Sequence, residues 1–128
     1  MMLGVVSKIM NILKIGLEFS KVPRGRFRTD GGASGERFRE DYLKKRIDDL
    51  KPGEKLTIII DDGVQGYGSS FLVEGFAGMV KYGYIQAKDL MNKLEIIHTN
   101  PEFSFYKKKI EQYINEAQFN SKEYRPSA

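Results

Sequence analysis

Two adjacent serines, Ser69 and Ser70, are the side chains best placed to accept a chemical group. They follow a glycine-bearing loop at residues 63–68 and precede apolar residues with the spacing of one helix face, at residues 72–80. A hydroxyl at the start of a helix lies where the helix dipole favours negative charge. Two roles are therefore open: an ordinary helix cap, or an acceptor for a phosphate group that adds about −1.5 to −2 charges.

A second candidate site is a loop rich in arginine and glycine. Four cations and no acid fall within residues 21–28, and glycines follow up to the helix start expected at Ser34. Glycines that open a helix beside arginines suit a phosphate or another anion, although charges that pair within the loop are the simpler interpretation. The residues of this partner-binding or anion-binding candidate are Arg24, Arg26, Asp30, Gly31, Gly32, Ser34, Gly35, Glu36 and Arg39.

Acidic and aromatic residues around the first loop form a candidate interaction edge. Asp61, Asp62 and Glu74 have the ligand chemistry for Mg²⁺ or for acid–base work, but aspartates at strand ends more commonly accept from turn N–H groups. The single histidine, His98, has no cysteine or second histidine to complete a metal set. The residues of this edge are Asp61, Asp62, Gly66, Tyr67, Gly68, Phe71 and Glu74.

Composition narrows the class of protein. The chain has 128 residues, 41% of them hydrophobic and 30% charged, which is the composition of an ordinary globular domain. The absence of cysteine excludes disulfides, thiol nucleophiles and iron–sulfur chemistry. A net charge of +4 does not by itself imply nucleic-acid binding, although Phe27 and Phe38 lie among basic clusters and keep that alternative open. No apolar run reaches the length of a membrane span, and we expect a cytoplasmic protein without a cofactor.

The hydrophobic pattern predicts the elements that position these residues. Strands are expected at residues 13–20, 56–60 and 94–98, and helices at 34–50, 69–80 and 101–117, with a short helical turn at 87–91. This alternation predicts an α/β domain with a mostly parallel sheet and right-handed crossovers. Both glycine-bearing loops follow strands, so they should share one edge of the molecule. The expected boundaries are a lead-in at 1–12, strand or helix, a domain at 13–118 and a frayed tail at 119–128.

Two motifs together resemble a known family. SSFLVEGFAGMV, after a buried strand and a DGV turn, resembles the STAS fold of bacterial anti-anti-sigma factors. The pair RFRTDGGASGERFRE and GYGSSFLVEGFAG is more similar to STAS-like domains of unknown function. The resemblance runs from about residue 13 to the last helix. Gly68 stands where the family usually has an acidic residue, and Phe71 where it usually has a small one.

The resemblance implies a STAS-like single domain that binds partners and does not catalyse a reaction. In anti-anti-sigma factors, a partner kinase of the GHKL ATPase type phosphorylates a serine at the start of this helix, which places Ser69 at the acceptor position with Ser70 beside it. We therefore expect a regulatory, protein-interaction module. The alternative is a nucleotide-binding or phosphate-binding sensor or small enzyme that uses the loop from Arg24 to Arg39.

Overall fold

The computed structural model describes residues 11–127. The expected lead-in at residues 1–12 lies almost wholly outside this range. Within the described residues, the strands β1 (Ile12–Lys14), β2 (Leu56–Ile59) and β3 (Leu94–Ile97) form a parallel sheet in the order β1-β2-β3. Ile58 of β2 lies opposite Leu13 on one side and Ile96 on the other. The predicted α/β class with a parallel sheet is confirmed.

Two long helices follow the first two strands, and each has a wider π-helical turn in its middle. The first runs through α3 (Gly35–Phe38), η2 (Arg39–Leu43) and α4 (Lys44–Asp48). The second runs through α5 (Ser69–Leu72), η3 (Val73–Ala77) and α6 (Gly78–Lys81). The remaining helices are α2 (Ile15–Glu18), η1 (Arg28–Asp30), α7 (Ala87–Lys93), η4 (Pro101–Phe103) and α8 (Ser104–Glu116).

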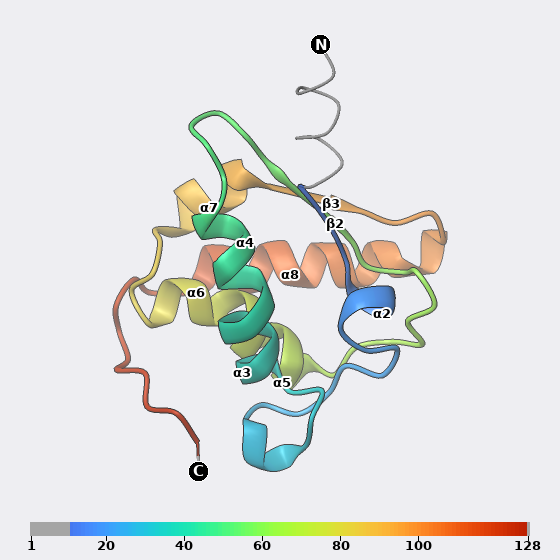
Figure 1. Ribbon diagram of the computed structural model, residues 1–128, viewed down its shortest axis with the longest axis horizontal. Helices are drawn as coiled ribbons and strands as arrows, with labels where there is room; N and C mark the ends of the chain where they lie inside the picture. The colour runs from blue at the N-terminus through green and yellow to red at the C-terminus, as the bar shows by residue number, and fades with distance from the viewer. Residues whose placement is uncertain (1–10, 128) are drawn as a thin grey trace.

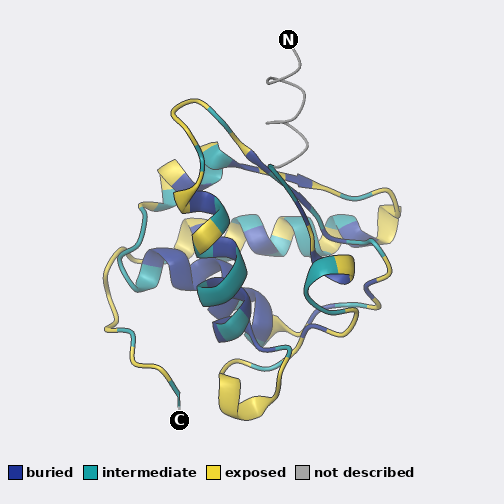
Figure 2. Cartoon of the chain, in the orientation of Figure 1, coloured by how far each residue is buried: buried dark blue, intermediate teal, exposed yellow. Residues whose placement is uncertain are grey.

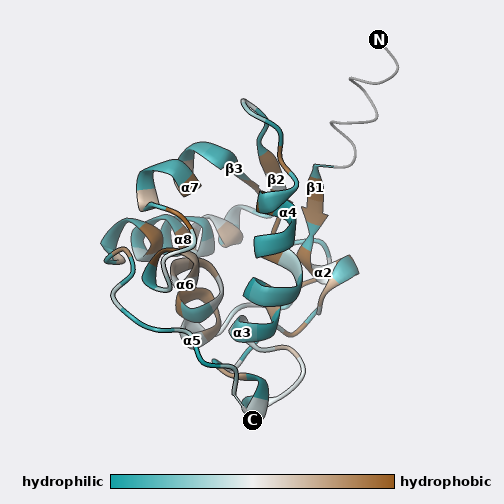
Figure 3. Cartoon of the chain, turned by 60° about the vertical axis from the view of Figure 1, so that its left-hand side comes forward, coloured by the Kyte–Doolittle hydropathy of each residue, from teal (hydrophilic) through white to brown (hydrophobic). Residues whose placement is uncertain are grey.

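The helices gather on one side of the sheet (Figures 1 and 3). This follows from the strand order, because right-handed crossovers between sequential parallel neighbours place their helices on the same face. The strands alternate accordingly, with Leu56, Ile58, Leu94 and Ile96 buried against the helices. The helix of residues 69–81 lies at the centre of the helical layer and is buried along most of its length (Figure 2).

Glycines allow the two long helices to cross closely. A Cβ on Gly35 would lie 2.7 Å from the backbone oxygen of Phe71 and 2.8 Å from the backbone nitrogen of Gly75. On the facing helix, a Cβ on Gly75 would lie 3.2 Å from the Phe38 ring. This close approach at Gly35 and Gly75 sets the separation of the two helices.

The strand expected at residues 13–20 is wrong beyond Lys14. The chain turns into the short helix α2, because the carboxylate of Asp62 accepts hydrogen bonds from the backbone N–H groups of Gly16 and Leu17, both at 2.9 Å. Gly16 also lies directly against the backbone of Asp62, where a Cβ would come within 2.1 Å of its oxygen. Leu17 consequently points outward and is 73% exposed.

The prediction of a frayed C-terminal tail is also wrong. Residues 118–127, here called the C-terminal segment, run back past α6 towards the start of α3 (Figure 1). The N–H of Asn120 donates to the carbonyl of Val80 at 2.9 Å, and that of Lys122 donates to Lys81 at 3.0 Å. The segment is therefore attached to the helical layer.

Candidate functional site

The two glycine-bearing loops lie side by side at the carboxyl edge of the sheet, as expected for loops that both follow parallel strands. The N–H of Gln65, in the loop after β2, donates to the carbonyl of Lys21 at 3.0 Å. A Cβ on Gly68 would lie 3.9 Å from the Cβ of Arg24. A hollow of about 550 Å³, here called the rim hollow, opens between the loops. Its lining residues are Gly25, Arg26, Phe27, Asp30, Gly68, Ser69 and Ser70.

Ser69 and Ser70 occupy the first turn of the central helix, but neither is its cap. Gly68 is the N-cap residue, and its extended backbone leads directly into Ser69. The cap interpretation of the serines is therefore wrong. Ser69 is exposed and Ser70 is half-buried, and both face the rim hollow. Their hydroxyls lie at the positive end of a helix of residues 69–81, where added negative charge is favoured.

The arginine loop, defined as residues 21–34, is closed by its own backbone and by Asp30. One carboxylate oxygen of Asp30 accepts from the N–H of Arg26 at 3.1 Å and from that of Phe27 at 2.8 Å. Ser34 caps α3 as predicted, since its hydroxyl oxygen accepts from the N–H of Arg37. Gly31 and Gly32 lie exposed at the outer end of the loop. The loop is therefore ordered, with the backbone of Arg26 fixed beside the hollow.

Positive charge gathers where the arginine loop approaches the C-terminal segment. The side chains of Arg24 and Arg26 are exposed and have no hydrogen bond or ion pair with another described residue. Burial lowers the pKa of Lys81, and the nearby charge of Lys122 lowers it further; Glu74 opposes this and Arg26 adds to it. An anionic group would therefore meet several cations on this side of the molecule.

Arg39, expected in an anion-binding loop, instead lies in the interior. Its Nη1 donates to the carbonyl and carboxylate of Glu74, both at 2.8 Å, and its Nε donates to Glu40 at 2.8 Å. The guanidinium carbon lies 4.4 Å from the ring centre of Tyr82 and 4.9 Å from that of Tyr124. Burial would lower the pKa of Arg39, but the bonds to Glu40 and Glu74 hold it above its ordinary value. Arg39 and Glu74 are therefore structural partners.

Glu36 is likewise buried, and its carboxylate already accepts hydrogen bonds from other residues of the protein. Its carboxylate accepts from the N–H of Arg28 at 2.9 Å, from the Tyr124 hydroxyl at 2.6 Å, and from the hydroxyl and N–H of Ser127 at 2.6 and 3.0 Å. Ser34, Gly35 and Glu36 are all buried, so this part of the predicted anion site does not face solvent.

The carboxylates of Asp61 and Asp62, just after β2, accept hydrogen bonds from the residues that follow the two neighbouring strands. Asp62 binds the start of α2 after β1, as described above. Asp61 accepts from the N–H groups of Thr99 and Asn100, after β3, at 2.6 and 2.7 Å. Burial alone would raise the pKa of Asp61, but these hydrogen bonds lower it below its ordinary value. The simpler interpretation, aspartates that bind turn N–H groups, is confirmed.

Several other residues of the predicted interaction edge belong to the core. Phe71 is fully buried and Tyr67 is nearly so, with its hydroxyl donating to the carbonyl of Ile60 at 2.7 Å. Gly66 lies against the Tyr106 hydroxyl. Phe38 is also buried, whereas Phe27 is 40% exposed and lines the rim hollow, so only one of the two aromatic residues that kept a nucleic-acid interpretation open lies on the surface. Of the interaction edge, Gly68 alone also lines the rim hollow.

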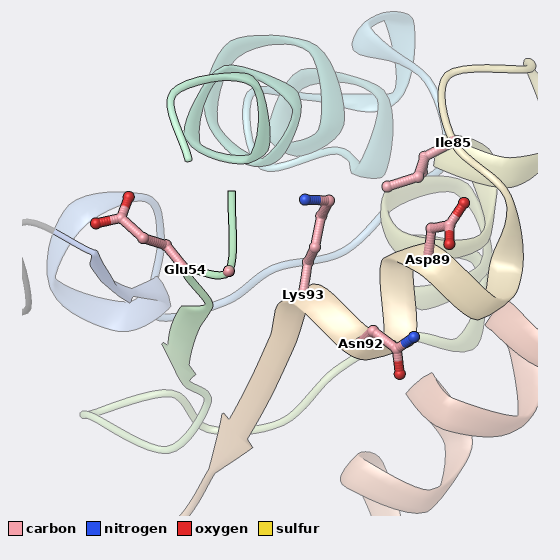
Figure 4. Close-up of a pocket in the computed structure, with 6 residues that line it drawn as sticks. Glu54, Ile85, Asp89, Asn92 and Lys93 are labelled. Atoms are coloured by element: carbon pink, nitrogen blue, oxygen red, sulfur yellow. The ribbon is translucent and has the colours of Figure 1, made fainter. Parts of the chain in front are cut away.

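A second hollow, of about 340 Å³, lies at the amino edge of the sheet. Glu54 comes from the turn before β2, whereas Asp89, Asn92 and Lys93 come from α7 (Figure 4). Gly53 and Ile85 complete its lining. Nothing in the sequence pattern indicated this hollow, because its residues come from separate polar segments without a shared motif.

Sequence reasoning also missed the partners of the buried charges. The Tyr82 hydroxyl donates to Glu74 at 2.6 Å, and the Tyr84 hydroxyl donates to Glu40 at 2.7 Å. Tyr124 and Ser127 are separated from Glu36 by 88 and 91 positions. Local periodicity carries no signal for contacts at such separations.

Within residues 11–127, no group of histidine, cysteine or acidic side chains is arranged to hold a metal ion. In the same range, no helix combines the length and the apolar character needed to cross a bilayer. Comparison with known proteins found no matching family model, no matching curated protein and no matching solved structure.

Proposed function

We propose that this chain is a STAS-like regulatory domain that acts in the cytoplasm by binding a protein partner, and that phosphorylation of Ser69 switches the interaction. The observation that carries the proposal is the position of Ser69. Its exposed hydroxyl lies in the rim hollow, where two loops from different strands meet. The sequence resemblance supports a GHKL-type ATPase as the partner kinase.

Charge explains how such a switch would act. A phosphate on Ser69 adds about two negative charges at the positive end of the central helix, close to the exposed side of the arginine loop. A partner surface that fits the rim around the unmodified Ser69 would then meet the added bulk and negative charge of the phosphate, which ends the contact. Ser70 offers a second hydroxyl, but it is half-buried.

The test uses a purified GHKL-type ATPase encoded beside this protein. After incubation with ATP, intact-mass and peptide mass spectrometry should show one phosphate on Ser69. The modification should disappear in Ser69→Ala and persist in Ser70→Ala and in Ser121→Ala, a matched exposed serine in the C-terminal segment. Binding to the same ATPase should weaken at least about tenfold in Ser69→Asp. If both hydroxyls stay unmodified, the switch is wrong.

A second candidate is an anion or nucleotide sensor, favoured by the exposed side chain of Arg26 beside the two serines. The burial of Glu36 and Arg39 removes them from this site. Phosphate and nucleotides at millimolar concentration should then raise the melting temperature of the wild type, but not that of Arg26→Ala. An unchanged melting temperature in the wild type excludes this candidate.

A further inference from the structure

We infer that the C-terminal segment is a peptide ligand held in cis: a groove at Glu36, Arg39 and Tyr82 binds its Tyr124 and Ser127, and this occupancy fixes the arginine loop. The inference goes beyond the proposed function and does not depend on it.

The floor of the groove is formed by two buried side chains of opposite charge, each with partners of its own. Glu36 and Arg39 lie three residues apart in the first long helix, and neither side chain has any exposed surface. Nη2 of Arg39 is a buried nitrogen that makes no hydrogen bond to any described residue. The rings of Tyr82 and Tyr124 contact this guanidinium instead, and they lie 5.4 Å from each other. The groove is therefore closed on one side by Tyr124, a residue of the segment itself.

The segment binds at a few defined points, in the manner of a docked peptide. The N–H groups of Asn120 and Lys122 donate to the carbonyls at the end of α6. Tyr124 and Ser127 then place two hydroxyls and one N–H on the Glu36 carboxylate. Most other residues of the segment are exposed. The groove thus recognises a tyrosine followed three residues later by a serine.

The Glu36 carboxylate should bind the segment tightly, because it is charged and buried. A buried carboxylate needs several donors, because an unsatisfied charge in the interior is costly. The segment supplies three of the four hydrogen bonds described for the Glu36 carboxylate, and the N–H of Arg28 supplies the fourth. Removing the segment would leave the carboxylate with the arginine loop as its remaining partner.

The same carboxylate joins the segment to the loop. One oxygen of Glu36 accepts from both the Ser127 hydroxyl and the N–H of Arg28. The N–H of Glu36 in turn donates to the carbonyl of Arg26 at 2.9 Å. Release of the segment should therefore loosen the backbone at Arg26 and Arg28, next to the rim hollow.

Amide hydrogen exchange of the full chain, resolved by NMR, tests both parts of the inference. In the double variant Tyr124→Phe with Ser127→Ala, the amides of Arg28, of Lys122 and of position 127 should exchange about ten times faster than in the wild type, or more, after correction for the intrinsic rate of each residue type. The matched control, Tyr113→Phe with Ser121→Ala, deletes two hydroxyls that make no hydrogen bond to any residue of 11–127, and should exchange as the wild type does. Slow exchange of Ile58 in β2 verifies that each variant is folded.

A peptide with the sequence of the segment, QFNSKEYRPS, provides the test in trans. Added to the double variant, it should restore slow exchange at Arg28, whereas the same peptide with Phe and Ala at the two positions should not. Wild-type exchange at the amide of position 127 in the double variant would overturn the binding of the segment. Wild-type exchange at Arg28 alone would overturn the coupling to the loop. Failure of the intact peptide to restore protection would overturn the groove as a ligand site.

Discussion

At the scale of single residues, hydrogen bonds from neighbouring groups keep buried acidic and basic side chains in their charged forms. Burial alone would raise the pKa of the Glu36 carboxyl. Hydrogen bonds from the side chains of Ser127 and Tyr124 and from the N–H of Arg28 outweigh that effect and lower the pKa from 4.5 to about 2. The contribution of Glu36 to stability therefore depends on pH.

We predict that this contribution is lost in acid. The pKa of Glu36 is lower in the folded chain than in the unfolded one, so its contribution is complete above pH 4.5 and disappears as the pH falls towards about 2. The full effect corresponds to about 3 kcal/mol. Urea unfolding across this range should show a loss of free energy of unfolding that Glu36→Gln lacks and that the exposed control Glu116→Gln retains. Parallel curves for wild type and Glu36→Gln would contradict the assignment.

At the scale of elements, the crossing of the two long helices depends on a glycine contact. Gly35 lies so close to Phe71 and Gly75 that a methyl group would meet backbone atoms of the facing helix. Backbone atoms cannot rotate away as a flexible side chain can, so the helices themselves would have to separate.

We predict that Gly35→Ala lowers the free energy of unfolding by about 2 kcal/mol or more through overpacking. Gly32→Ala is the matched control. A Cβ at Gly32 meets no atom within 4 Å, so this change should stay within about 0.5 kcal/mol of wild type. The measurement is urea unfolding followed by circular dichroism. Equal stability of the two variants would show that the crossing tolerates a side chain.

Local signals in the sequence were sufficient for most elements. The apolar runs at β2 and β3 predicted strands, and Ser34 predicted a helix start that the structure confirms. Asn100 caps η4, before α8, through its side-chain oxygen. The helix α2 could not be predicted in this way. Leu13, Ile15 and Leu17 alternate as in a strand, whereas the carboxylate that bends the chain belongs to Asp62, more than forty positions later.

The candidate site was predictable in outline but not in its details. The prediction that both loops follow parallel strands was enough to place them at one edge of the sheet. The burial of Arg39, Glu36 and Glu74 depends on tyrosines and on a C-terminal segment that are remote in sequence. A charged side chain on a predicted helix looks solvated until such partners are known.

At the scale of the whole molecule, the two ends of the described chain are tied into one body. The first long helix contacts the second, the second contacts α8, and the C-terminal segment returns from α8 to Glu36. Unfolding of any one of these helices, or detachment of the segment, therefore removes contacts from the others.

We predict a single cooperative unfolding transition. Far-ultraviolet circular dichroism, which reports helices, and near-ultraviolet signals from tyrosine, which report the packing around Tyr67, Tyr82 and Tyr124, should give the same midpoint and slope in urea. An earlier tyrosine transition would show that the C-terminal segment detaches before the helices unfold.

The pair Asp61 and Asp62 also discriminates against misfolded arrangements. One carboxylate reaches the chain after β1 and the other reaches the chain after β3, which is possible only when β2 lies between them. A collapsed intermediate with β1 directly beside β3 would leave at least one of the two aspartates without its backbone N–H partners. These two adjacent side chains therefore widen the energy gap between the native topology and its nearest competitors.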